Sequence, residues 1–144
     1  MRVVIDTDVM VAALRSDRGA SRQLLLSALD RRIEVVVSVP LMIEYEAVLT
    51  RPEHLAASGL KAAEVNEILD AIASVVTPIY LRFLWRPRLK DPADEMVLET
   101  AVNGEADRLI TFNLRHLAEA ADEFGVRAVL PREAWREVRR YEKK

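Results

Sequence analysis

Short runs of β-branched residues alternate with longer amphipathic segments along almost the whole chain. The first two runs, residues 2–6 and 34–38, each have three consecutive β-branched apolar residues at their centre, which is typical of strands buried on both faces of a parallel sheet. The segments between the runs are long enough for the crossover helices that parallel strands require. The alternation therefore predicts an α/β fold, with a central parallel sheet between two layers of helices.

The expected order of elements is β-α-α-β-α-α-α-β-α-β-α-β-α. The expected strands cover residues 2–6, 34–38, 77–84, 108–111 and 126–130. The longer expected helices cover residues 9–14, 20–32, 40–50, 60–76, 91–104 and 114–124, with a last one from residue 131. Hydrophobic residues make up 51% of the chain, and there is no internal repeat or linker. Residues 1–144 are therefore expected to form a single domain around one core.

Composition excludes several kinds of chemistry. The chain has no cysteine, so disulfides, thiolate catalysis and cysteine-ligated zinc are ruled out. His54 and His116 are far apart in the sequence and lack the spacing of metal ligands. A net charge of −2 means that nucleic-acid binding would depend on a local basic patch. No signal peptide or membrane-spanning run is apparent, so a cytoplasmic protein is expected.

Two aspartates are expected to point toward one edge of the sheet. Asp6 follows the first strand, where open α/β sheets bind their ligands, and Asp8 is expected to cap the next helix. Asp91 suits the N-cap of a later helix, with Pro92 in its first turn. Asp94 continues the inward-facing stripe of that helix, whose other members are Val97, Leu98, Ala101 and Glu105. Glu95 and Glu99 fall on other faces and are expected to be solvated.

A third acid, Glu44, lies at the edge of the buried stripe of the helix over residues 40–50. Carboxylates that share a cleft repel one another and raise one another's pKa, and a divalent cation relieves that repulsion. Ligands that are all oxygen indicate Mg²⁺ or Mn²⁺ rather than zinc or copper. Asp6, Glu44 and Asp94 therefore predict an acidic metal site on an α/β domain.

Four segments also carry a resemblance to a known family: residues 3–9, 38–52, 91–101 and 106–117. In these segments and their order, the chain resembles the PIN-domain family over about residues 2–130. It is most similar to the branch that contains VapC-like toxins of toxin–antitoxin systems. The resemblance implies a three-layer α/β/α, Rossmann-like nuclease domain that uses Mg²⁺ or Mn²⁺ to hydrolyse RNA. It also implies an antitoxin partner and a homodimer.

The resemblance assigns roles residue by residue. Asp6, Glu44 and Asp94 stand where the family has its first three catalytic, metal-binding acids. Asn113 stands where the family usually has a fourth aspartate, so this chain departs from the pattern there. Thr111 resembles the small hydroxyl residue that often joins the site. Asp91 is expected to support the site from the helix cap.

A basic and aromatic segment precedes Asp91. Arg86, Arg88 and Lys90 are expected to border the RNA path, together with Arg82 and Trp85, because such side chains suit phosphate contact and base stacking. The alternative is that Trp85 packs in the core and that the arginines belong to a solvated loop.

Two other functions are open. Residues 6–9 are also similar to the start of haloacid dehalogenase-type phosphatases, but the later acidic and hydroxyl residues follow in the wrong order. A generic phosphate monoester as substrate would distinguish that class. The other alternative is a catalytically weak PIN-like scaffold that binds RNA or a protein partner, which Asn113 favours.

Overall fold

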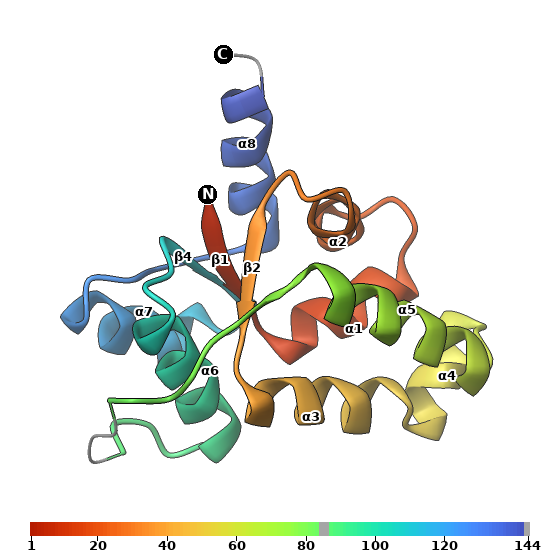
Figure 1. The fold of residues 1–144 in the computed structure, drawn as a ribbon, viewed down its shortest axis with the longest axis horizontal. Helices are drawn as coiled ribbons and strands as arrows, with labels where there is room; N and C mark the ends of the chain where they lie inside the picture. The colour runs from red at the N-terminus through yellow and green to blue at the C-terminus, as the bar shows by residue number, and fades with distance from the viewer. Residues whose placement is uncertain (84–86, 143–144) are drawn as a thin grey trace.

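The computed structural model describes residues 1–83 and 87–142, and it contains a parallel sheet with strand order β3-β2-β1-β4-β5 (Figure 1). The strands are β1 (Arg2–Ile5), β2 (Glu34–Val37), β3 (Thr77–Pro78), β4 (Arg108–Ile110) and β5 (Arg127–Val129). All four pairings between neighbouring strands are parallel. The predicted parallel sheet and its order of elements are confirmed.

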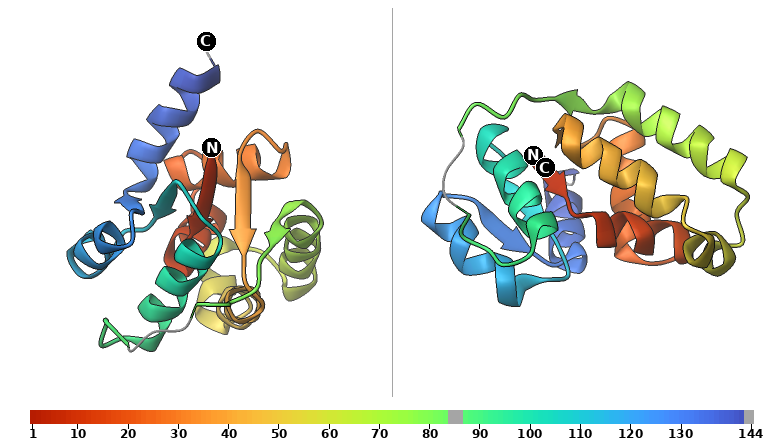
Figure 2. Two further views of the ribbon diagram at one scale, coloured as in Figure 1. Left: turned by 60° about the vertical axis from the view of Figure 1, so that its left-hand side comes forward. Right: turned by 90° about the horizontal axis from the view of Figure 1, so that it is seen from below.

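The described ranges contain eight helices, of which seven lie between strands in the chain and the last follows β5. They are α1 (Thr7–Arg15), α2 (Ala20–Leu29), α3 (Val39–Leu49), α4 (Pro52–Ser58), α5 (Ala62–Val75), α6 (Pro92–Asn103), α7 (Leu114–Glu123) and α8 (Pro131–Glu142). Helices α6 and α7 pack together on one face of the sheet, and α1, α2 and α8 lie on the other (Figure 2). Helix α3 begins just beyond the carboxyl end of β2 and packs against α1 and α5 (Figure 1). The arrangement is the expected three-layer α/β/α domain.

The sheet is the centre of the hydrophobic core. Val3, Val4 and Val36 are inaccessible to solvent, as are Leu109 and Ile110 of β4. Burial of this apolar surface is the dominant stabilising contribution, at about 25 cal/mol per Å². Strands buried on both faces explain why the runs are continuous rather than alternating.

Gly104 ends α6, as expected, because there is no room for a side chain. A Cβ at this position would lie 2.9 Å from Cγ2 of Val36 and 2.9 Å from the carbonyl oxygen of Thr100. Its φ of −86° is ordinary helical backbone, so the left-handed geometry of many helix ends is not the reason for glycine. The close approach of α6 to β2 is what requires it.

The structure corrects four local predictions. Helix α1 begins at Thr7, so Asp6 rather than Asp8 is its N-cap, and Asp8 is exposed in the first turn. Glu105 lies beyond the end of α6 with a φ of 50° and is exposed, so it does not continue the inward stripe. Strand β3 is only two residues long. Glu95 is buried with 6% of its surface exposed, although solvation was expected.

None of the helices in residues 1–83 and 87–142 has the length and apolar character needed to cross a bilayer.

Candidate acidic active site

Asp6 and Thr111 meet at the carboxyl edge of the sheet because β1 and β4 are parallel neighbours. The backbone N–H of Asp6 donates to the carbonyl of Ile110 at 2.9 Å, which continues the pairing one residue past β1. The Thr111 hydroxyl donates to Oδ2 of Asp6 at 2.7 Å. Both side chains are buried, and Asp6 is 7% exposed. The two strand ends therefore fix one carboxylate at the floor of the site.

The surroundings of Asp6 disfavour its charge. The pKa of Asp6 is raised to about 6, mainly by burial and in part by the charges of Asp8 and Asp94, whereas the hydrogen bond from Thr111 opposes the rise. A carboxyl group whose pKa is raised by burial in a polar cleft is typical of functional sites.

Asp94 lies in the first turn of α6 and is 8% exposed, which confirms that it faces inward. Asp91 precedes it as the N-cap and accepts a hydrogen bond from the Ala93 N–H at 2.9 Å. The amide Nδ2 of Asn113 donates to Oδ2 of Asp94 at 3.0 Å. Burial raises the pKa of Asp94, the Asn113 hydrogen bond opposes this, and the charge of Asp91 adds to it.

Asn113 and Thr111 connect the two aspartates. The backbone N–H of Asn113 donates to Oγ1 of Thr111 at 2.9 Å, while the Thr111 hydroxyl donates to Asp6. Together with the hydrogen bond from the Asn113 side-chain amide to Asp94, these contacts form a continuous chain of hydrogen bonds from Asp6 to Asp94. The short segment after β4 therefore orients both carboxylates.

Glu44 reaches the same region from α3. The neighbouring Tyr45 is fully buried, and its hydroxyl donates to the carbonyl of Ile5, which fixes α3 against the end of β1. Burial raises the pKa of Glu44, the Arg51 charge opposes this, and the charges of Asp91, Asp8 and Asp94 add to it. Its Oε2 atom is buried without a hydrogen-bond partner among the described residues. An oxygen in that position needs a proton, water or a cation.

The carboxylates present suit a hard divalent cation in kind, because every candidate donor is oxygen. The unpartnered Glu44 oxygen and the raised pKa of Asp6 also fit a site for positive charge. However, no three histidine, aspartate or glutamate side chains within the described ranges lie close enough together to hold a metal ion as they stand. A single ion shared by Asp6, Glu44 and Asp94 therefore stays a prediction.

A hollow of about 520 Å³ lies beside Asp94, between the loop before α6 and helix α7. Its charged lining consists of Arg88, Lys90, Asp91, Asp94, Arg115, His116, Glu119 and Glu123. Nδ1 of His116 is 3.9 Å from Oδ2 of Asp94. Cationic side chains next to a carboxylate site are what a phosphate-bearing ligand requires.

The basic and aromatic residues that were expected to border the RNA path differ in their surroundings. Lys90 is exposed at this hollow and forms no ion pair within the described part of the chain. Arg88 is held by Glu123 at 2.6 Å and lies 5.7 Å from the centre of the Phe124 ring. Arg86 and Trp85 lie outside the described residues.

Arg115 and His116 were not predicted from the sequence, although both line the hollow. Their only signal is their place in the first turn of the helix that follows Asn113. That turn is brought beside Asp94 by the packing of α7 on α6, which local periodicity does not reveal.

A parallel sheet flanked by helices, with aspartates at the carboxyl edge of its central strands, defines a Rossmann-like α/β domain with an acidic site. The sequence matches the PIN domain model over residues 2–115, and the chain therefore belongs to the PIN-domain family. Members of this family are generally nucleases, and they typically use divalent metal ions. This favours the nuclease resemblance over the phosphatase one.

The fold is also similar to one chain in the crystal structure of VapBC2 from Rickettsia felis bound to a DNA fragment from their promoter. The TM-score is 0.59 at 14% sequence identity, and the likeness covers 90% of this chain and 98% of that chain. At this identity the likeness establishes the fold. No curated protein matches the sequence.

Proposed function

We propose that this protein is a Mg²⁺-dependent endoribonuclease and the toxin of a type II toxin–antitoxin pair. The observation that carries the proposal is the hydrogen-bonded chain from Asp6 to Asp94 at the carboxyl edge of the sheet, beside a hollow with cationic walls. Membership of a family of nucleases supports hydrolysis of a phosphodiester. The raised pKa of Asp6 supports a cation site, because a bound cation would stabilise the ionised form of this carboxyl group.

In this proposal Asp6 and Asp94 are direct metal ligands, and Glu44 ligates directly or through water. Mg²⁺ or Mn²⁺, when bound, supplies a Lewis acid for the phosphate oxygen and lowers the pKa of the attacking water. Thr111 orients Asp6 through the hydrogen bond that its hydroxyl donates, and Asn113 orients Asp94 through the hydrogen bond from its side-chain amide. The cationic side chains that line the hollow, Arg88, Lys90 and Arg115, bind substrate phosphates. Arg86 keeps the RNA-binding role that the sequence predicts for it.

The test is cleavage of a structured RNA over a titration of Mg²⁺. Asp6→Asn and Asp94→Asn should each lower the rate more than about 100-fold, because direct ligands matter at least as much as the groups that orient them. Asp70→Asn is the matched control, since Asp70 is exposed on α5, away from the site. Equal rates for all three variants would rule out this site.

An antitoxin is the proposed protein partner. The similar fold found within the VapBC2 complex motivates this, and an acidic cleft suits an inserted arginine or lysine. Co-purification with the product of the adjacent gene is the direct test. Absence of a small neighbouring gene would count against a toxin.

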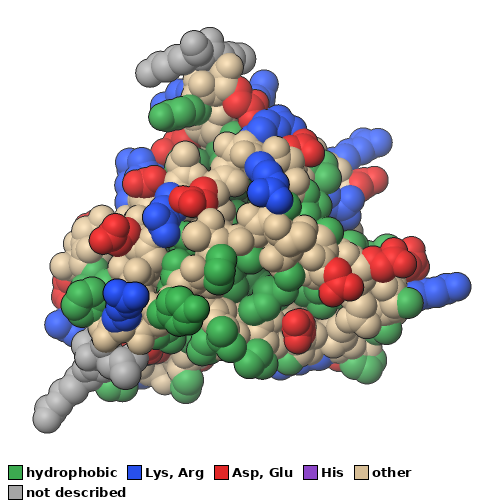
Figure 3. Space-filling view, in the orientation of Figure 1, with side chains coloured by type: hydrophobic (Ala, Val, Ile, Leu, Met, Phe, Trp, Pro, Cys, Tyr) green, Lys and Arg blue, Asp and Glu red, His purple; other side chains and the backbone are tan. Residues whose placement is uncertain are grey.

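A homodimer is proposed on the basis of exposed apolar side chains. Val39 and Ile43 of α3, with Tyr80 and Phe83 after β3, are strongly exposed. Hydrophobic side chains gather near the centre of one face of the molecule (Figure 3). Such a patch favours association. Sedimentation of the wild type and of Ile43→Asp should show a dimer that the substitution weakens.

A catalytically weak scaffold is the second candidate. The amide of Asn113 in place of a carboxylate favours it, as does the lack of a three-carboxylate cluster in the residues described. RNA binding that persists without any metal-stimulated cleavage would favour this alternative.

A further inference from the structure

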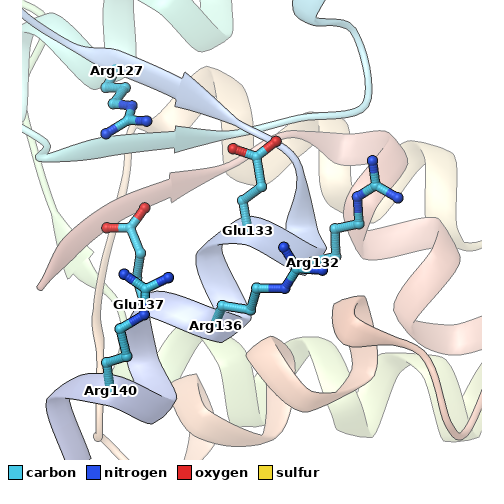
Figure 4. Close-up of a pocket in the computed structure, with 6 residues that line it drawn as sticks. All are labelled: Arg127, Arg132, Glu133, Arg136, Glu137 and Arg140. Carbon is cyan, nitrogen blue, oxygen red and sulfur yellow. The ribbon is translucent and has the colours of Figure 1, made fainter.

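Helix α8 carries a row of arginines along one face. Arg132, Arg136 and Arg140 follow one another at intervals of four residues, so they share a face and are spaced about 6 Å apart along the helix. Together with Arg127 of β5 they surround a hollow of about 510 Å³, which also contains Glu133 and Glu137 (Figure 4). This region lies outside residues 2–115, which the family model matches.

The charge of this row is largely uncompensated. Glu137 is paired with Arg108 at 3.0 Å, and Glu142 is paired with Arg32 at 3.1 Å. None of the four arginines around the hollow forms an ion pair with any residue in the described ranges, and Glu133 is the one lining carboxylate there without such a partner. Guanidinium groups gathered in this way repel one another, and a bound polyanion would remove that repulsion.

The row lies on a well-packed helix, and its first arginine lies beside Phe112. Ala134 and Val138 bury the opposite face of α8, which packs on α2. Arg132 also lines a largely apolar hollow of about 480 Å³ together with Phe112. Phe112 is 51% exposed and stands between Thr111 and Asn113, the two residues that orient the aspartates.

We propose that the α8 row and Arg127 bind the sugar–phosphate backbone of a single-stranded RNA segment, with a base stacked on Phe112. Arginine forks bind phosphate oxygens in a bidentate manner, and the regular spacing suits successive phosphates rather than a single anion. A positively charged track with an aromatic platform is the usual means of binding single strands. This assignment rests on the proposed function, in which RNA is the substrate, and places part of its binding outside the cleavage site.

The experiment measures binding of a labelled single-stranded RNA by fluorescence anisotropy in EDTA, where cleavage cannot interfere. Arg136→Glu should weaken binding several-fold at low salt and reduce the slope of log affinity against log salt by about 0.7 or more. Phe112→Ala should weaken binding at least roughly fivefold without changing that slope. Arg139→Glu is the matched control, because it makes the same charge change on α8 at a residue that does not line the hollow.

Equal affinities for Arg136→Glu and Arg139→Glu would overturn the proposal. Preferential, Arg136-dependent binding of duplex DNA over RNA would also overturn it. Melting curves establish that each variant folds, and Arg136→Gln replaces Arg136→Glu if that variant does not.

Cleavage of RNA in Mg²⁺ is measured separately. If Arg136→Glu loses RNA binding while the wild type does not cleave RNA, the RNA-binding surface on α8 is supported and the nuclease is refuted. If the wild type cleaves RNA but Arg136→Glu does not weaken RNA binding, the nuclease is supported and the RNA-binding surface on α8 is refuted.

Discussion

Asp6 holds a carboxyl group at the end of β1 in surroundings that penalise its charge. Its pKa in the folded protein is raised from 3.8 to about 6, mainly by burial. An acid whose pKa is higher in the folded than in the unfolded state contributes stability that is fully present below the unfolded pKa. This contribution is lost as the pH rises through the folded pKa. At neutral pH the protein therefore carries the cost of an ionised, buried Asp6, and this cost is what a cation would offset.

We expect Asp6→Asn to stabilise the metal-free protein at pH 7.5. Removing the penalised charge should raise the free energy of unfolding by up to about 3 kcal/mol, while an asparagine oxygen still accepts from Thr111. At pH 4 the gain should be much smaller, because Asp6 is protonated in the fold. Thermal unfolding in EDTA at both pH values tests this, with Asp70→Asn as control. A gain that is the same at both pH values would show that charge is not its cause.

Asn113 contributes a donor where a fourth acid would contribute a charge. The hydrogen bond from its side-chain amide is compatible with an ionised Asp94. An aspartate at position 113 would instead bring two carboxylates into contact. We expect Asn113→Asp to lower the melting temperature in EDTA. In Mg²⁺ it should reduce the concentration needed for half-maximal activity, by about tenfold if binding strengthens by ~1.4 kcal/mol.

Activity curves for wild type and Asn113→Asp are measured side by side against Mg²⁺. Asn66→Asp on the exposed face of α5 is the matched control for added charge. Superimposable curves for wild type and Asn113→Asp would show that position 113 is not a ligand.

At the scale of elements, α6 holds the loop that follows β3 at two points. Oδ1 of Asn103 accepts from the N–H groups of Arg82 at 2.7 Å and Phe83 at 2.6 Å. Oε2 of Glu95 accepts from the N–H groups of Arg88 at 3.0 Å and Leu89 at 2.8 Å. The second contact fixes the loop immediately before Lys90, at the rim of the site.

We expect Glu95→Ala to destabilise the protein by about 1–3 kcal/mol, because the partly buried backbone N–H groups of Arg88 and Leu89 lose their acceptor. RNA should bind more weakly through a displaced Lys90, so KM should rise more than kcat falls. Glu95→Gln keeps one acceptor oxygen and should restore most of both. Unfolding curves and steady-state kinetics on the three proteins test this. An unchanged KM in Glu95→Ala would mean that the loop does not position the substrate.

The same helix shows how far its sequence predicts structure. The helical period places Asp94 beside Val97 and Leu98, and its burial is confirmed because neighbours on that face pack on the sheet. Glu95 falls outside this face, and it is buried because the loop that directly precedes α6 folds back over it, which the helical period does not encode. By contrast, the contact of Tyr45 with Ile5, which fixes Glu44, joins residues 40 apart in the sequence and is truly non-local.

For the whole molecule, the strand runs and crossovers were sufficient to predict the layers, because parallel strands buried on both faces have few alternatives. The set of acids at the carboxyl edge was predictable for the same reason. Their mutual distances were not, since these depend on side-chain packing across β1, α3 and α6. The small net charge of −2 also conceals two regions of opposite charge, the acidic edge of the sheet and the arginine row of α8.

Metal binding at the acidic edge should stabilise the entire domain, because the ligands come from elements that separate on unfolding. At a free Mg²⁺ or Mn²⁺ concentration of roughly ten times Kd, the linkage adds about 1.4 kcal/mol, a rise of a few degrees in Tm. Asp94→Asn should lose most of this rise, whereas Asp70→Asn should keep it. Differential scanning calorimetry over a metal titration measures both without requiring catalysis. A Tm that does not respond to either ion in the wild type would exclude a metal site formed by Asp6, Glu44 and Asp94.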